Sequence, residues 1–102
     1  MYKSKVRLIP LTDEDEIIVR TGFAFPGALT EVSVHYRARI KERWMEVARW
    51  DNAHGVPHVH YFWRERPGEP LAANTTPTQL LRIATEDLFQ HAFEYRARME
   101  LM

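Results

Sequence analysis

The chain contains no cysteine, and only four of its 102 residues are glycine. The absence of cysteine excludes a disulfide framework, a thiolate metal site and a cysteine nucleophile. No apolar run approaches the roughly 18 residues of a membrane span. The basic residues near the start are not followed by the apolar segment of a signal peptide. We therefore expect a protein without a membrane anchor, in the cytoplasm.

An excess of one charge is also lacking. The 14 lysines and arginines balance 14 aspartates and glutamates, so the formal net charge is zero. Attraction to nucleic acid would therefore have to come from a local basic patch. A chain of 102 residues, of which 45% are hydrophobic, is long enough for one core that buries roughly 60–65% of the unfolded surface. We expect a single domain over residues 1–102.

Five successive stretches have the composition and alternation of half-buried strands. They span residues 2–9, 17–25, 31–40, 44–51 and 57–64. The acidic residues 13–16 are typical of a solvated turn, Pro26 and Gly27 of another, and the proline-rich residues 66–76 of a loop. Strands that follow one another in this way predict an antiparallel meander.

One long helix is expected after the loop. Thr76, Pro77 and Gln79 are typical of a helix start, with threonine as the N-cap and glutamine three residues later. Apolar residues then recur every three or four positions, and the helix would run about 25 residues. That stripe consists of Leu81, Ala84, Leu88, Ala92, Tyr95 and Met99. The predicted fold class is α+β: a curved, mainly antiparallel, five-stranded sheet packed by one long C-terminal helix.

The segment RWDNAHGVPHVHYFW, residues 49–63, holds three of the five histidines. A turn at residues 52–55 would place Arg49 opposite His58. A three-residue loop at 41–43 would keep the apolar residues of the preceding strand on one face and place His35 opposite Arg49. His35, Arg49 and His58 would then form a row across three strands, on the face away from the helix. Glu46 fits this alignment poorly, because it falls on the apolar face.

Such a cluster suits RNA cleavage without a metal. One imidazole takes the proton of a 2′-hydroxyl, another protonates the leaving oxygen, and a guanidinium stabilises the charge on phosphorus. We expect Asp51 to orient one imidazole. The candidate catalytic residues are His35, Arg49, Asp51, His54, His58 and His60. If they share that face, the residues expected to hold the RNA backbone are Lys3, Lys5, Arg7, Arg37 and Arg39.

Two other readings stay open. His58 and His60 project from one side of a strand, about 7 Å apart at their α-carbons, a spacing that two ligands of one metal ion can span. His-Val-His with Glu65 also resembles part of the first cupin motif, but no second motif follows. In a purely structural reading, the histidines satisfy hydrogen bonds, Asp51 and Asn52 form an Asx turn, and Gly55 supplies a positive φ. The chain would then be a non-catalytic interaction module. No cofactor is predicted.

Arg-Trp-Asp-Asn-Ala-His at 49–54 and Pro-His-Val-His at 57–60, followed by a helix, resemble a segment of the TumE-like toxins of bacterial toxin–antitoxin pairs. About fifteen residues carry this resemblance, and the last seventy share its general plan. Where that family tends to carry adjacent histidines, this chain has a single one at His54. The resemblance implies a toxin that acts on RNA and pairs with a cognate antitoxin protein, with a homodimer left open.

Overall fold

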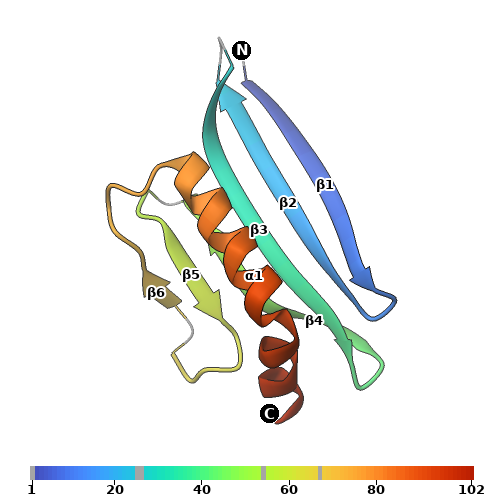
Figure 1. Ribbon diagram of the computed structural model, residues 1–102. Coiled ribbons are helices and arrows are strands. Elements are labelled where there is room, and N and C mark those ends of the chain that lie inside the picture. Colours follow the sequence, from blue (N-terminus) through green and yellow to red (C-terminus); the bar gives the residue numbers. More distant parts are fainter. Residues whose placement is uncertain (1, 25–26, 54, 67) are drawn as a thin grey trace.

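The computed structural model describes residues 2–24, 27–53, 55–66 and 68–102. Six strands form one antiparallel sheet in which each strand pairs with its sequence neighbours, and one helix lies across a single face (Figure 1). The α+β class is confirmed, with six strands in place of five. The elements are β1 (Tyr2–Thr12), β2 (Asp15–Ala24), β3 (Ala28–Ile40), β4 (Arg43–Asp51), β5 (His58–Tyr61), β6 (Gly68–Pro70) and α1 (Pro77–Glu100).

The additional strand, β6, lies in the segment that was predicted to be a loop. It has three residues and pairs with β5, placing Gly68 opposite His60. A run of three residues is too short to show an alternating pattern. A β-carbon on Gly68 would lie 3.3 Å from Nε2 of His60. Glycine therefore allows the His60 imidazole to pack directly against the edge strand.

Helix α1 begins and packs as the sequence indicates. The Thr76 side chain accepts a hydrogen bond from the backbone of Gln79, whose own side chain accepts one from the Thr76 backbone, so the capping box is complete. The helix has 24 residues and packs against β3 and β4. Leu81 and Tyr95 of the predicted stripe are only partly buried. Leu80, which was not in the predicted stripe, is fully buried. The buried helix residues are Leu80, Ala84, Leu88, Ala92 and Met99.

The turn between β3 and β4 corrects the predicted loop at 41–43. Ile40 pairs directly with Arg43, so the turn has two residues, Lys41 and Glu42, with φ of 54° and 65°. Two consecutive positive φ values are typical of the type I′ turns that join antiparallel strands. The register then shifts once, because Tyr36 pairs with Ala48 while Arg37 pairs with Glu46. Residue 47 is therefore the extra residue of a β-bulge.

This bulge changes the face of the sheet to which the side chains in the first part of β4 point. Residues before it alternate out of phase with residues after it, because side chains in a strand change face at every position. Trp44 was expected under the helix, but it pairs with Arg39 on the other face and is 43% exposed. Glu46 also leaves the apolar face, which removes the misfit in the predicted alignment.

The carboxylate of Asp15, at the start of β2, is buried at one end of the sheet. Asp15 is fully buried although it belongs to the acidic stretch that was predicted to be a solvated turn. The Tyr36 hydroxyl donates a hydrogen bond to Asp15 Oδ2 at 2.7 Å, and the Thr12 hydroxyl donates to Oδ1. Burial and the adjoining Asp15 raise the pKa of Tyr36 far above its usual range. Asp15 therefore connects the β1–β2 turn to β3.

Replacing Asp15 with alanine is expected to lower the free energy of unfolding by about 1–3 kcal/mol, because the buried Tyr36 hydroxyl loses its acceptor. The control is Asp13→Ala, since Asp13 is exposed in the turn between β1 and β2 and such changes stay within about 0.5 kcal/mol. Urea unfolding of both variants measures the difference. Equal midpoints would contradict the structural role of Asp15.

Candidate functional site

The histidine cluster lies on the sheet face opposite α1. His35 of β3 pairs with Arg49 of β4, as the sequence predicts, and Arg49 pairs with His60 of β5. The prediction that Arg49 faces His58 is wrong by two residues: Asp51 pairs with His58, because the connection spans residues 52–57. An offset of two preserves the face, so the predicted residues still gather. His54 lies outside the described residues.

The connection between β4 and β5 is longer than a hairpin turn, and Asn52 at its start binds back to β3. Its side-chain oxygen accepts from the Val32 amide at 3.0 Å, and its amide group donates to the Thr30 carbonyl at 3.1 Å. Asp51 Oδ1 accepts from the Ala53 amide at 3.3 Å, the Asx geometry of the structural reading, and Gly55 has a φ of 94°. These contacts hold the start of the loop beside the cluster.

Glu46, Ser33 and His35 form one hydrogen-bonded chain. Nδ1 of His35 lies 2.7 Å from Oε1 of Glu46, and Nε2 lies 3.2 Å from the Ser33 hydroxyl. An ionised carboxylate can only accept, so Nδ1 carries the proton. In the neutral ring Nε2 then accepts the hydrogen bond from Ser33. The bond to His35 is the main cause that holds the pKa of Glu46 below its usual value. His35 is thus fixed in the tautomer of a general base.

Arg49 lies at the centre of the cluster between two carboxylates. Its Nε is 3.1 Å from Asp51 Oδ2, and its Nη1 is 3.8 Å from Glu46 Oε1. Nε is buried and makes no hydrogen bond to any residue that the structure describes, so its approach to Asp51 is electrostatic and poorly aligned. The guanidinium also lies over the ring of Phe62, 5.5 Å from its centre. These contacts place a permanently charged group in the middle of the face.

The two histidines of β5 make different hydrogen bonds. Nη2 of Arg49 donates to Nδ1 of His60 at 3.2 Å, and this requires a neutral His60 because guanidinium cannot accept. Burial, then Arg49 and His58, lowers the pKa of His60. In contrast, His58 Nδ1 donates to the Val56 carbonyl at 3.0 Å, and its Nε2 lies 3.5 Å from Asp51 Oδ1. Asp51 is thus the carboxylate beside the His58 ring.

A surface hollow of about 380 Å³ opens over the cluster. Its lining consists of Ser33, His35, Arg49, Asp51, Ala53, His58 and His60. A second hollow of about 250 Å³ shares Ser33 and Ala53 with it and extends towards Arg20 and β1. The cluster is therefore open to a ligand that lies across the strands.

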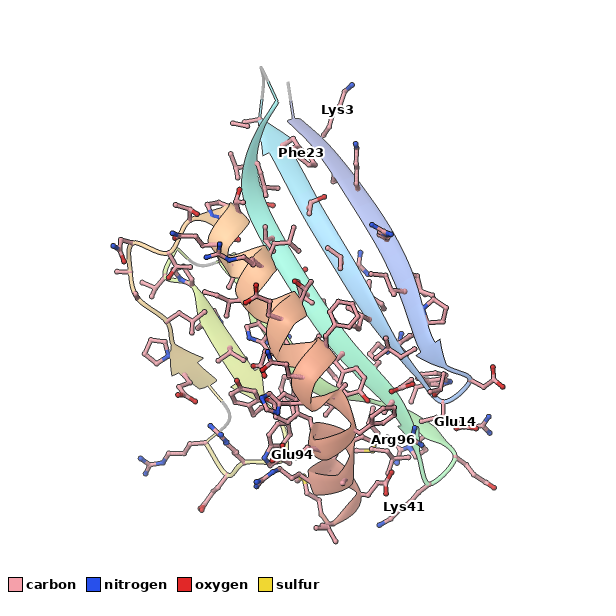
Figure 2. All side chains as sticks on the ribbon, viewed as in Figure 1. Lys3, Glu14, Phe23, Lys41, Glu94 and Arg96 are labelled. Atoms are coloured by element: carbon pink, nitrogen blue, oxygen red, sulfur yellow. The ribbon has the colours of Figure 1, made fainter. Side chains whose placement is uncertain are left out.

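The residues predicted to hold RNA divide between the two faces. Arg7 pairs with Val19 and Lys5 with Thr21, which places them on the α1 face, and Lys3 follows the same alternation. Figure 2 shows Lys3 near Phe23, at the end of the sheet remote from the C-terminus of α1. Lys3, Lys5 and Arg7 therefore do not share the face of the histidine cluster, as their predicted contact with RNA required. Arg37 and Arg39 do lie on the cluster face, where Arg37 pairs with Glu16 at 3.5 Å.

Three residues of this site were missed by sequence reasoning. Glu46 was assigned to the wrong face, and Ser33 and Arg20 were not considered. The alternation of β3 already placed Ser33 beside His35, so that signal was available. Among the residues that the structure describes, no group of three histidine, cysteine or acidic side chains is arranged to hold a metal ion. No helix in the described ranges combines the length and hydropathy of a membrane span.

A family model described as a domain of unknown function, DUF7718, matches residues 3–101. The chain belongs to the DUF7718 family. The match extends from β1 to the end of α1, so the DUF7718 domain includes the whole sheet and its histidine face. No match is found among curated proteins or solved structures.

The Glu46–His35 contact predicts a pH effect on stability. Because folding lowers the pKa of Glu46, its ionised form stabilises the folded state above the ordinary value of 4.5, and this contribution disappears as pH falls through the lower folded pKa. We expect the wild type to be more stable than Glu46→Gln at pH 7, with the difference shrinking below about pH 4.5. Thermal unfolding from pH 7 to pH 3 measures it, and a constant difference would contradict the assignment.

Proposed function

We propose that this protein binds and cleaves RNA without a metal, using the cluster on the face away from α1. The observation that carries the proposal is the bond from His35 to Glu46, which leaves Nε2 as the unprotonated nitrogen of the imidazole, beside the Ser33 hydroxyl at the hollow that both residues line. His35 would take the proton of a 2′-hydroxyl, whose oxygen attacks the adjacent phosphorus. His58 in its protonated form would give a proton to the departing 5′-oxygen.

The spacing of the two imidazoles supports these roles. His35 is on β3 and His58 on β5, with β4 between them. Neighbouring strands lie about 4.8 Å apart, and His58 is level with Ser33, two residues from His35, so the two backbones are roughly 12 Å apart. A phosphate group would fit between two side chains that reach across this distance. Arg49 on β4 lies between them and would donate to the non-bridging oxygens.

Because positive and negative charges alternate on this face, we expect RNA to be bound by local contacts and not by long-range attraction. Arg20, Arg37 and Arg39 share the face with Arg49, while Glu16, Glu31, Glu46 and Asp51 carry the opposite charge. A protonated imidazole would make the face positive, so we expect RNA binding to strengthen as pH falls from 8 to 6.

A toxin role is part of the proposal and rests on the resemblance of residues 49–60 to TumE-like toxins. The DUF7718 match neither adds to this resemblance nor detracts from it, so the role stays a prediction. A toxin that cleaves cellular RNA would act in the cytoplasm and would need an antitoxin protein as partner. Growth of bacteria expressing the wild type beside His58→Ala tests this role.

The biochemical test uses purified protein and a labelled single-stranded RNA of mixed sequence, with EDTA present throughout. We expect fragments that end in 2′,3′-cyclic phosphates, because the 2′-hydroxyl is the nucleophile. DNA of the same sequence lacks that hydroxyl and should stay intact. The control variant is His91→Ala, which changes a histidine of α1 on the other side of the sheet and should cleave normally. Intact RNA, or equal cleavage of DNA, would overturn the proposal.

A further inference from the structure

We propose that Ser33 is an activated nucleophile and that the protein transfers acyl groups from small carboxylic esters through a covalent Ser33 intermediate. The feature that suggests this is the chain of contacts from the Ser33 hydroxyl to Nε2 of His35 at 3.2 Å, and from Nδ1 to Glu46 at 2.7 Å. A hydroxyl, an imidazole and a carboxylate in this order are the arrangement that activates serine in unrelated folds.

The sheet itself holds the three groups in place. Ser33 and His35 are two residues apart on β3, so they point to the same side. The bulge at residue 47 then brings Glu46 to that side of β4. Glu46 would lie on the opposite face without the bulge, so this local irregularity completes the chain. Regular strands hold such side chains more firmly than loops do.

The reaction is balanced in its atoms and protons. His35 Nε2 takes the Ser33 proton while the Ser33 oxygen bonds to the ester carbonyl carbon. The carbon–oxygen bond to the alcohol then breaks, and the alcohol leaves with the proton held by His35. Water repeats the sequence: it gives a proton to His35, attacks the acyl-serine carbonyl and releases a carboxylic acid and the free Ser33 hydroxyl. Arg49 pairs with His35 on the neighbouring strand. Its guanidinium is the cation placed to stabilise the carbonyl oxygen as that oxygen becomes negative.

The charge of the site indicates a neutral substrate for this reaction. Asp51 of β4 pairs with Ser33 of β3, and its Oδ2 lies 3.1 Å from Nε of Arg49. With Glu46 also present, two carboxylates face one guanidinium. An uncharged ester would add no further charge to this arrangement. The hollow of about 380 Å³ has room for a small ester.

The test is covalent labelling with a fluorophosphonate, which replaces its fluoride with the oxygen of an activated serine. The chain has two serines, Ser4 and Ser33, so peptide mass spectrometry assigns the adduct without ambiguity. We expect one adduct on Ser33 and a burst of p-nitrophenol from p-nitrophenyl acetate. His35→Ala should slow both by about 10²-fold or more, because general base catalysis contributes 10²–10⁴-fold.

Ser4→Ala is the matched control and should label like the wild type. Ser4 is exposed on β1, and within the described residues no imidazole contacts its hydroxyl. Folding of Ser33→Ala and Glu46→Gln is checked by circular dichroism, and the wild-type adduct is informative even if a variant unfolds. No adduct, or equal adducts on both serines, would overturn the inference. An adduct on Ser33 in a protein that leaves RNA intact would support it and remove the RNA proposal. RNA cleavage without an adduct on Ser33 would support the RNA proposal and overturn the acyl-transfer proposal.

Discussion

Replacing His35 with alanine is expected to slow RNA cleavage by about 10²–10⁴-fold, because the 2′-hydroxyl loses its general base. The side chain is not needed for the core, since His35 projects from the face opposite α1 and is only partly buried. The variant should therefore fold, and its RNA affinity should change little. Initial rates at saturating RNA measure the loss. Cleavage at the wild-type rate would exclude His35 as the base.

Glu46→Gln separates positioning from proton transfer. The amide can still contact His35, but it carries no charge and can present either an oxygen or an NH₂ group to Nδ1. We expect the maximal rate to fall by less than in His35→Ala, with an unchanged Michaelis constant. Arg49→Ala should lower the maximal rate and also raise the Michaelis constant, with a weaker salt dependence, because the proposed contact of Arg49 is to phosphate. If Glu46→Gln weakened binding alone, Glu46 would be a ligand contact and not a positioning residue.

The sequence predicted the fold well where one physical rule dominates. Alternation identified the strands, and the capping box with its apolar stripe located α1 to within a residue. It also placed His35 opposite Arg49, because apolar residues that must face the helix leave one choice of side. The sixth strand escaped because three residues carry no period.

The site could be predicted only in part, because its register depends on local irregularities. The bulge at residue 47 and the turn at Lys41 and Glu42 compensate for one another. A model without a bulge needs a three-residue loop to give the same pairing for His35. The two descriptions agree beyond the bulge and differ before it, where Glu46 and Trp44 change face. No residue type in the hairpin marks the two-residue turn, since both positive-φ positions are occupied by charged residues in place of glycine or asparagine.

Trp50→Ala is expected to lower the free energy of unfolding by about 3–5 kcal/mol, the usual cost of removing a large buried ring. Trp50 is 1% exposed, between Val34 and Val59 in the sheet. Its ring also meets the edge of Tyr61, with 6.0 Å between ring centres. The total stability of a domain of this size is about 5–15 kcal/mol, so much of it would be lost. Urea unfolding followed by far-ultraviolet circular dichroism measures the change without relying on tryptophan fluorescence.

Trp44→Ala is the matched variant, since it removes the same side chain from the same strand. On the face away from α1, Trp44 is 43% exposed and contacts Arg37, whose guanidinium lies 5.5 Å from the ring centre. An exposed contact of this kind contributes about 0.5–1 kcal/mol, so the cost should stay near that value. In a strand without the bulge, positions 44 and 50 would share one face and both rings would lie under the helix. Equal losses in the two variants would therefore contradict the bulge, and with it the placement of Glu46 beside His35.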